Sequence, residues 1–176
     1  MEDQLLEHYG PNYIFRNGTP LIQECFFYEP LCRAIALGLD TNIRVRYHGE
    51  YISLLLFSLL YPASLAQYEL LKPIAKFKDE NEEREAALIL HMHEICDLVS
   101  VNNNPEIIDE KLLATLQLLQ DSDSLWYFPI ISNFVIAINL RFKFYKQSTK
   151  EIMQNIVRLL IAKGVNCEQQ ANRILS

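Results

Sequence analysis

The sequence predicts an all-α protein built from stacked helix pairs. Two apolar stripes with helical spacing each run up to a glycine, at residues 31–37 before Gly38 and at residues 156–162 before Gly164. A glycine directly after a helix is typical of a left-handed C-terminal cap. Only residues 41–47 alternate apolar and charged side chains as a strand does. The 176 residues, 50% of them hydrophobic, suit one domain with a sizeable core.

The first predicted pair lies in residues 17–47. We expect Thr19 to cap a helix that begins at Pro20, where the missing amide costs little and φ is already helical. Pro30 is expected at the start of the second helix, and Gly38 at its end. Apolar side chains recur at helical spacings on both segments, so the two helices are expected to share one buried seam. Residues 41–47 are expected to form a short hairpin arm after this pair.

Two further pairs in the middle of the chain are predicted from pattern alone, within residues 48–81 and 82–124. Their helices are expected at residues 49–60, 65–76, 85–99 and 108–120. The acidic run at residues 79–85 favours the N-terminus of the helix that follows, because negative charge is stabilised at that end of a helix. Asn and Pro at residues 102–105 predict a loop between the last two helices.

The last predicted pair spans residues 125–167, and residues 168–176 form a C-terminal cap. We expect its first helix at residues 133–139 and its second at residues 156–162, after a long linker at 141–149. Ser148 or Thr149, followed by Glu151, is a candidate N-cap for the second helix.

Three short elements resemble parts of an ankyrin repeat. Gly-Thr-Pro-Leu at 18–21 and Gly-Leu-Asp-Thr-Asn at 38–42 are similar to its opening and closing, and Ala-Lys-Gly-Val-Asn at 162–166 is similar to its closing. Ile22 stands where the family usually has histidine. The resemblance implies an ankyrin-like solenoid of about four irregular repeats that binds a partner protein through hairpin tips and first helices. A HEAT-like array and an unrelated helical bundle are the alternative folds.

Degenerate ankyrin units with long insertions are similar to those of host-directed bacterial and viral effectors. The resemblance therefore implies a non-catalytic scaffold in the cytoplasm, delivered into a host cell in the effector case. Composition agrees with an intracellular location, because four cysteines lack any CxxC spacing and the N-terminus lacks a signal-peptide pattern. The net charge of −6 argues against nucleic acid as the main partner. Pro62 interrupts the uncharged run at 51–68, so no membrane span is expected.

Two segments are the candidate partner-binding sites. The first is the basic and aromatic arm, and the second is a turn with the only tryptophan of the chain. Aromatic and arginine side chains are enriched at binding hot spots, because they present a large surface with a polar edge. The predicted contact residues are Arg44, Arg46, Tyr47, His48, Asp121, Asp123, Trp126 and Tyr127.

The alternative function is a small helical enzyme or metal-binding protein that uses His91, His93, Cys96 and Asp97. Geometry argues against it, since helical residues two apart point about 200° apart and the HExxH spacing is absent. His93 and Asp97 share a face, which permits one hydrogen bond. We therefore expect no enzyme activity, metal or cofactor.

The cysteines and one further segment have a structural interpretation. Cys25 and Cys32 are expected in the core and Cys167 at the surface. The basic and aromatic residues at 141–146 could contact nucleic acid, but this segment is short. It is interpreted as a helix extension whose aromatic side chains pack inward.

Overall fold

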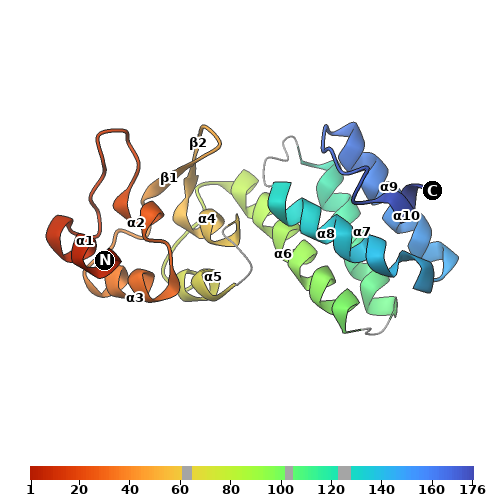
Figure 1. The fold of residues 1–176 in the computed structure, drawn as a ribbon, viewed down its shortest axis with the longest axis horizontal. Helices are drawn as coiled ribbons and strands as arrows, with labels where there is room; N and C mark the ends of the chain where they lie inside the picture. Colours follow the sequence, from red (N-terminus) through yellow and green to blue (C-terminus); the bar gives the residue numbers. More distant parts are fainter. Residues whose placement is uncertain (61–64, 102–104, 123–127) are drawn as a thin grey trace. The chain divides into compact units, whose positions relative to one another are not determined.

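The computed structural model describes residues 1–60, 65–101, 105–122 and 128–176. Contacts between residues divide the chain into two compact units, 1–82 and 83–176, and each unit is described by itself. Helices make up most of the described chain (Figure 1), which confirms the mostly helical class. None of the described helices is long and apolar enough to cross a membrane.

The first unit contains five helices and one hairpin in its described residues. α4 is the centre of its core, because all seven residues of this helix are buried. α4 contacts α5 and both strands, and α3 contacts α1 and α5. The elements are α1 (Glu2–Tyr9), α2 (Leu21–Glu24), α3 (Tyr28–Ala36), β1 (Arg44–Tyr47), β2 (Glu50–Ser53), α4 (Leu54–Leu60) and α5 (Ala66–Leu71).

The start of the first pair differs from the prediction. α2 begins at Leu21 after Pro20 and has no side-chain cap, so the prediction that Thr19 caps this helix is wrong. The physical reason is that the backbone of the preceding loop forms hydrogen bonds within the loop and to the first residue of α2. The Thr19 carbonyl accepts the Phe15 amide at 2.9 Å, and the Leu21 amide donates to the Tyr13 carbonyl at 2.8 Å.

The second helix of that pair begins before Pro30 and ends as predicted. Pro30 is the third residue of α3, where the missing amide has no intrahelical acceptor to lose. Gly38 has a φ of 91° and ends the segment in the left-handed conformation, which confirms that prediction. The Gly38 amide donates to Ile35 and the Leu39 amide to Ala34, a pattern of bonds that closes the last turn.

The predicted hairpin arm is confirmed, with β1 and β2 paired antiparallel. His48 and Gly49 have φ values of 48° and 84°, and positive φ at both central residues is what a type I′ turn requires. The prediction of a helix from residue 49 is therefore wrong, because the two-residue turn returns the chain at once as β2. α5 is also shorter than predicted, because Pro73 supplies no amide to extend it.

The second unit contains long helices, and α6 starts in the first unit and continues into this one. α7 packs against α9, while α10 contacts α8, α9 and η1. The predicted helices at 133–139 and 156–162 are both longer, because no residue just before them breaks a helix. The elements are α6 (Glu80–Ser100), α7 (Pro105–Gln120), α8 (Phe128–Arg141), η1 (Phe142–Phe144), α9 (Gln147–Ala162) and α10 (Asn172–Leu175).

The start of α9 is tied to α7 through polar side chains. The Thr149 hydroxyl donates to Asp109 at 2.5 Å, and the Lys146 ammonium lies 3.4 Å from the same carboxylate. Neither Ser148 nor Thr149 is the N-cap, because α9 begins at Gln147. That prediction is wrong, since the buried Thr149 hydroxyl serves Asp109 instead.

The end of the chain confirms one prediction and corrects another. Gly164 has a φ of 91°, and its amide and that of Val165 close the last turn of α9 as Gly38 and Leu39 do in α3. Cys167 is buried, so the prediction that it is exposed is wrong. Val165 and Cys167 are both buried, whereas Asn166 between them is exposed.

α10 is capped by a residue of another helix. The Asn139 side-chain oxygen accepts the amides of Arg173 at 2.9 Å and Ile174 at 3.1 Å. Its amide group donates to Asn172 at 2.9 Å. Asn139 is buried, and these bonds satisfy its polar atoms while they fix the first turn of α10.

Candidate binding surface

The hairpin has one buried face and one exposed face. The register pairs Val45 with Ile52, and both side chains are buried against the core. It pairs Arg46 with Tyr51, so these two side chains lie on the opposite face together with Arg44. Ser53, the partner of Arg44 at the end of β2, is on this face by register but is buried. Tyr51 is 52% exposed. We call Arg44, Arg46 and Tyr51 the outer face of the hairpin.

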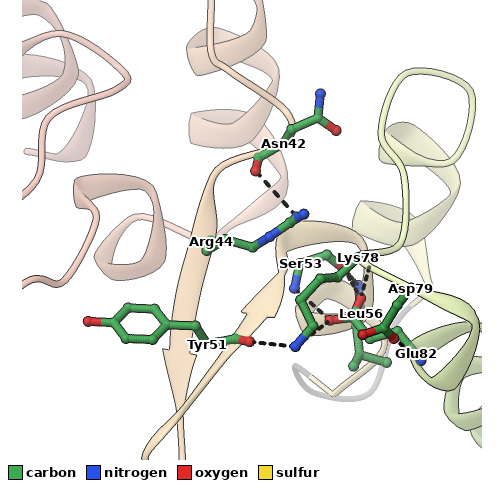
Figure 2. Close-up of polar contacts among 8 residues, drawn as sticks. All are labelled: Asn42, Arg44, Tyr51, Ser53, Leu56, Lys78, Asp79 and Glu82. Atoms are coloured by element: carbon green, nitrogen blue, oxygen red, sulfur yellow. Dashed lines mark hydrogen bonds and ion pairs between the residues drawn. The ribbon is translucent and has the colours of Figure 1, made fainter.

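Side chains form hydrogen bonds with backbone groups on both edges of this hairpin. On the β1 edge, the Gln23 amide group donates to the Arg46 carbonyl at 2.5 Å and accepts the Arg46 amide at 3.0 Å. On the β2 edge, the Lys78 ammonium donates to the Tyr51 carbonyl at 3.1 Å (Figure 2). The Ser53 amide on the same edge donates to Glu82 at 3.0 Å. A partner strand cannot pair at these positions without displacing them, so contact through side chains is favoured.

The two guanidinium groups of the outer face are held by backbone carbonyls. Arg44 donates to the Asn42 carbonyl at 3.3 Å (Figure 2), and Arg46 donates to the Asn17 carbonyl at 3.4 Å. The Arg46 guanidinium also lies 5.7 Å from the centre of the Tyr51 ring, within cation–π distance. Within the described ranges, no carboxylate lies within 4 Å of either guanidinium. Both groups therefore keep donors for a ligand.

A buried carboxylate, that of Glu82, is hydrogen-bonded to the last residue of β2. Glu82 is 3% exposed and accepts three hydrogen bonds, from the Ser53 hydroxyl at 2.5 Å, the Ser53 amide at 3.0 Å and the Lys78 amide at 3.0 Å. The Ser53 hydroxyl in turn accepts the Leu56 amide at 3.1 Å, and Asp79 accepts the Glu82 amide at 2.9 Å (Figure 2). One carboxylate thus joins the first turns of α4 and α6, because each helix is capped by a member of this cluster.

The predicted arm residues fall on different sides of the hairpin. Arg44 and Arg46 lie on the outer face, and His48 is exposed at the turn. Tyr47 lies on the other face, where its ring is 6.1 Å from that of Phe57, and it also packs edge-on against His48 at 4.5 Å. Burial raises the pKa of the Tyr47 phenol. The structure therefore groups the two arginines but not the tyrosine.

The second predicted segment lies mostly outside the described residues. Asp121 is exposed just after the end of α7, in the second unit. Asp123, Trp126 and Tyr127 fall among the residues that the structure does not describe. Their role in binding stays a prediction.

Sequence reasoning missed Tyr51, Gln23 and Lys78. The signal for Tyr51 was the His48-Gly49 pair, because a two-residue turn at 48–49 places residue 51 opposite residue 46. Gln23 and Lys78 carry no such signal, since each is a common surface residue until the fold brings it to a hairpin edge.

The side chains of the alternative site lie along α6. Among the described residues, no three His, Cys, Asp or Glu side chains gather as metal ligands would. His91 Nδ1 and His93 Nε2 are buried without a hydrogen-bond partner, so the His93–Asp97 bond that the spacing permits does not use this nitrogen. Burial, and after it the charge of Asp97, raises the pKa of the Cys96 thiol to about 11. Such a thiol is protonated near neutral pH, whereas a nucleophilic cysteine needs a lowered pKa.

The basic and aromatic segment at 141–146 differs from its interpretation as an extension that packs its aromatic rings inward. Phe142 is half-buried, with the Lys150 ammonium 5.5 Å from the centre of its ring, but Phe144 is exposed. Lys146 faces Asp109. This pairing reduces the positive charge that the segment offers to a phosphate backbone.

No family model, curated protein or solved structure matches this chain. The ankyrin resemblance therefore depends on the three sequence elements at 18–21, 38–42 and 162–166.

Gln23 gives a first testable prediction about the hairpin. Gln23→Ala is expected to leave the Arg46 amide and carbonyl to water, which costs about 1 kcal/mol because this edge is exposed. Hydrogen exchange at the Arg46 amide should become faster. Glu24→Ala, one residue further on in α2, is the control and should leave this amide unchanged. Equal protection in both variants would contradict the role given to Gln23.

Proposed function

We propose that this protein is a non-catalytic protein-binding module of ankyrin-like stacked helix pairs, and that the outer face of the hairpin contacts the partner. The main observation behind this proposal is that the side chains of this face are accessible to a partner and are also held in place by hydrogen bonds. Arg44 and Arg46 are held by backbone carbonyls, beside a half-exposed Tyr51. Side chains positioned before binding lose less conformational freedom when a partner arrives.

Two features support the repeat part of the proposal. The bonds that close α3 at Gly38 and α9 at Gly164 follow the same pattern, with the same φ of 91°. Two polar bonds, from Thr41 to the Ile74 carbonyl and from Asn139 to Asn172, each join residues 33 positions apart. That separation equals the period of ankyrin repeats, about 33 residues.

The location proposed is the cytoplasm, and delivery into a host cell follows if the protein is an effector. Long helices in the second unit, such as α6 with 21 residues, depart from the short ankyrin pair. The proposal therefore concerns irregular repeats.

The test is affinity capture from eukaryotic lysate, followed by binding of each captured protein to the purified chain. If Tyr51 is a hot spot, Tyr51→Ala is expected to reduce the binding free energy of the partner by roughly 2 kcal/mol, which is about 30-fold in affinity. Tyr28→Ala on α3 is a matched control, because Tyr28 is 49% exposed and Tyr51 is 52% exposed. If no captured protein distinguishes these two variants, the outer face is not the contact.

A further inference from the structure

We infer that the outer face binds an extended acidic segment of the partner protein, with carboxylates two residues apart. This inference rests on the proposed function, because it names the chemistry of the partner at the same face. It is carried by the spacing of the two arginines, by the lack of a carboxylate within 4 Å of them among the described residues, and by the occupied hairpin edges.

The spacing of the arginines selects the shape of the ligand. Arg44 and Arg46 are two residues apart on one face of β1, a repeat of about 6.8 Å along a strand. An extended peptide repeats its side chains at the same interval on each of its faces. Carboxylates at alternate positions can therefore meet one guanidinium each, through paired N–H donors. Carboxylates at adjacent positions point to opposite sides and cannot.

The charge around the face selects the sign of the ligand. Lys78 adds a third cation at the β2 edge, where its ammonium is 3.1 Å from the Tyr51 carbonyl and 4.0 Å from Glu82. Within the described part of the chain, no carboxylate lies within 4 Å of either guanidinium. Glu50 is paired with Tyr47, so its side chain belongs to the opposite face. The patch is therefore locally positive on a chain of net charge −6.

The occupied edges select the mode of contact. Gln23 is hydrogen-bonded to both the amide and the carbonyl of Arg46. On the other edge, Lys78 is bonded to the Tyr51 carbonyl and Glu82 to the Ser53 amide. An acidic segment that added itself as a third strand would have to break these bonds. It therefore lies across the side chains, where the exposed ring of Tyr51 supplies apolar contact beside the charges.

The test uses the full chain and fluorescently labelled serine-rich peptides with three aspartates. In one peptide the aspartates stand at every second position, in the next at every third, and in the last they are replaced by asparagine. We expect the every-second peptide to bind several-fold more tightly than the every-third peptide, and the asparagine peptide not to bind. Added salt should weaken binding, because the contacts are exposed charges.

Variants of the two arginines assign the binding to the outer face. Arg44→Gln combined with Arg46→Gln is expected to weaken the every-second peptide at least about tenfold, because charge-assisted bonds are lost. Arg44→Lys with Arg46→Lys keeps the charge but loses the paired donors, so the loss should be intermediate. Lys143→Gln with Arg158→Gln removes two exposed cations of the second unit and should change binding less than about twofold. Circular dichroism is used to check that each variant is folded.

Three results with the purified chain would overturn the inference. The first is equal binding of the two aspartate peptides, and the second is binding that survives the glutamine pair. The third is a labelled single-stranded oligonucleotide that binds more tightly than any peptide and depends on the same arginines. A captured protein that depends on Tyr51 but not on the arginines would reject the acidic partner and keep the protein-binding function. The reverse failure, with no Tyr51-dependent protein, would count against the function itself.

Discussion

Glu82→Ala is expected to destabilise the first unit by about 3 kcal/mol or more. The substitution removes the acceptor of three hydrogen bonds, from the Ser53 hydroxyl and from the amides of Ser53 and Lys78. Each buried donor left without a partner costs about 1–3 kcal/mol. Alanine also leaves a void where the carboxylate stands, because Glu82 is 3% exposed. Urea unfolding followed by far-UV circular dichroism measures the loss.

Two further variants separate the hydrogen bonds from the helix itself. Glu83→Ala changes the next residue of α6, which is exposed, and should cost less than about 0.5 kcal/mol. Glu82→Gln keeps one oxygen acceptor and removes the charge. Its decrease in the free energy of unfolding should therefore lie between those of the two alanine variants. A Glu82→Ala protein as stable as Glu83→Ala would show that the cluster contributes little.

The same substitution links stability to binding. Glu82 holds the Ser53 amide, and Ser53 ends β2, the strand that carries Tyr51. Loss of the carboxylate is therefore expected to loosen the β2 edge, and hydrogen exchange at the Ser53 and Lys78 amides should become faster. A partner that needs an ordered outer face should then bind more weakly, although Glu82 itself is buried and cannot contact it directly.

The features that the sequence predicted correctly depend on local chemistry. Gly38 and Gly164 end their helices because glycine adopts positive φ without steric cost. The strand at Arg44–Tyr47 follows from its alternation. A helix was also expected at the acidic run, but α6 begins at Glu80, within that run, and not at residue 85. Each of these predictions needs only the residues within a few positions of the one concerned.

The features that were missed depend on side chains that act over long sequence separations. Gln23 bonds to Arg46 across 23 positions, and Glu82 bonds to Ser53 across 29. Asn139 caps α10 across 33 to 35 positions. The first residues of α10 therefore carry no local signature of their cap. Thr19 and Thr149 have the local signature of a cap, but neither α2 nor α9 has a side-chain cap. The outer face of the hairpin was predicted only in part for the same reason.

Phe26→Ala is expected to cost about 3–5 kcal/mol, the range for a fully buried aromatic side chain. Phe26 is 0% exposed, and its ring lies edge-on to that of Phe57 with the ring centres 4.9 Å apart. Phe57 belongs to α4, whose residues are all buried, so little in its surroundings can move to fill a void. The edge-on pair adds about 0.5–1.5 kcal/mol beyond the buried area. Urea unfolding of the variant measures the total.

Phe27→Ala is the matched control, because it is the same substitution at the next residue, which is 51% exposed. Its cost should stay near 1 kcal/mol or below, since its ring is half in water already. The two variants have the same composition, because each replaces one of two neighbouring phenylalanines with alanine, so composition cannot account for a difference between them. A large difference would place the core of the first unit at the α4 side of this segment. Equal losses would contradict that placement, and with it the support that α4 gives to the hairpin.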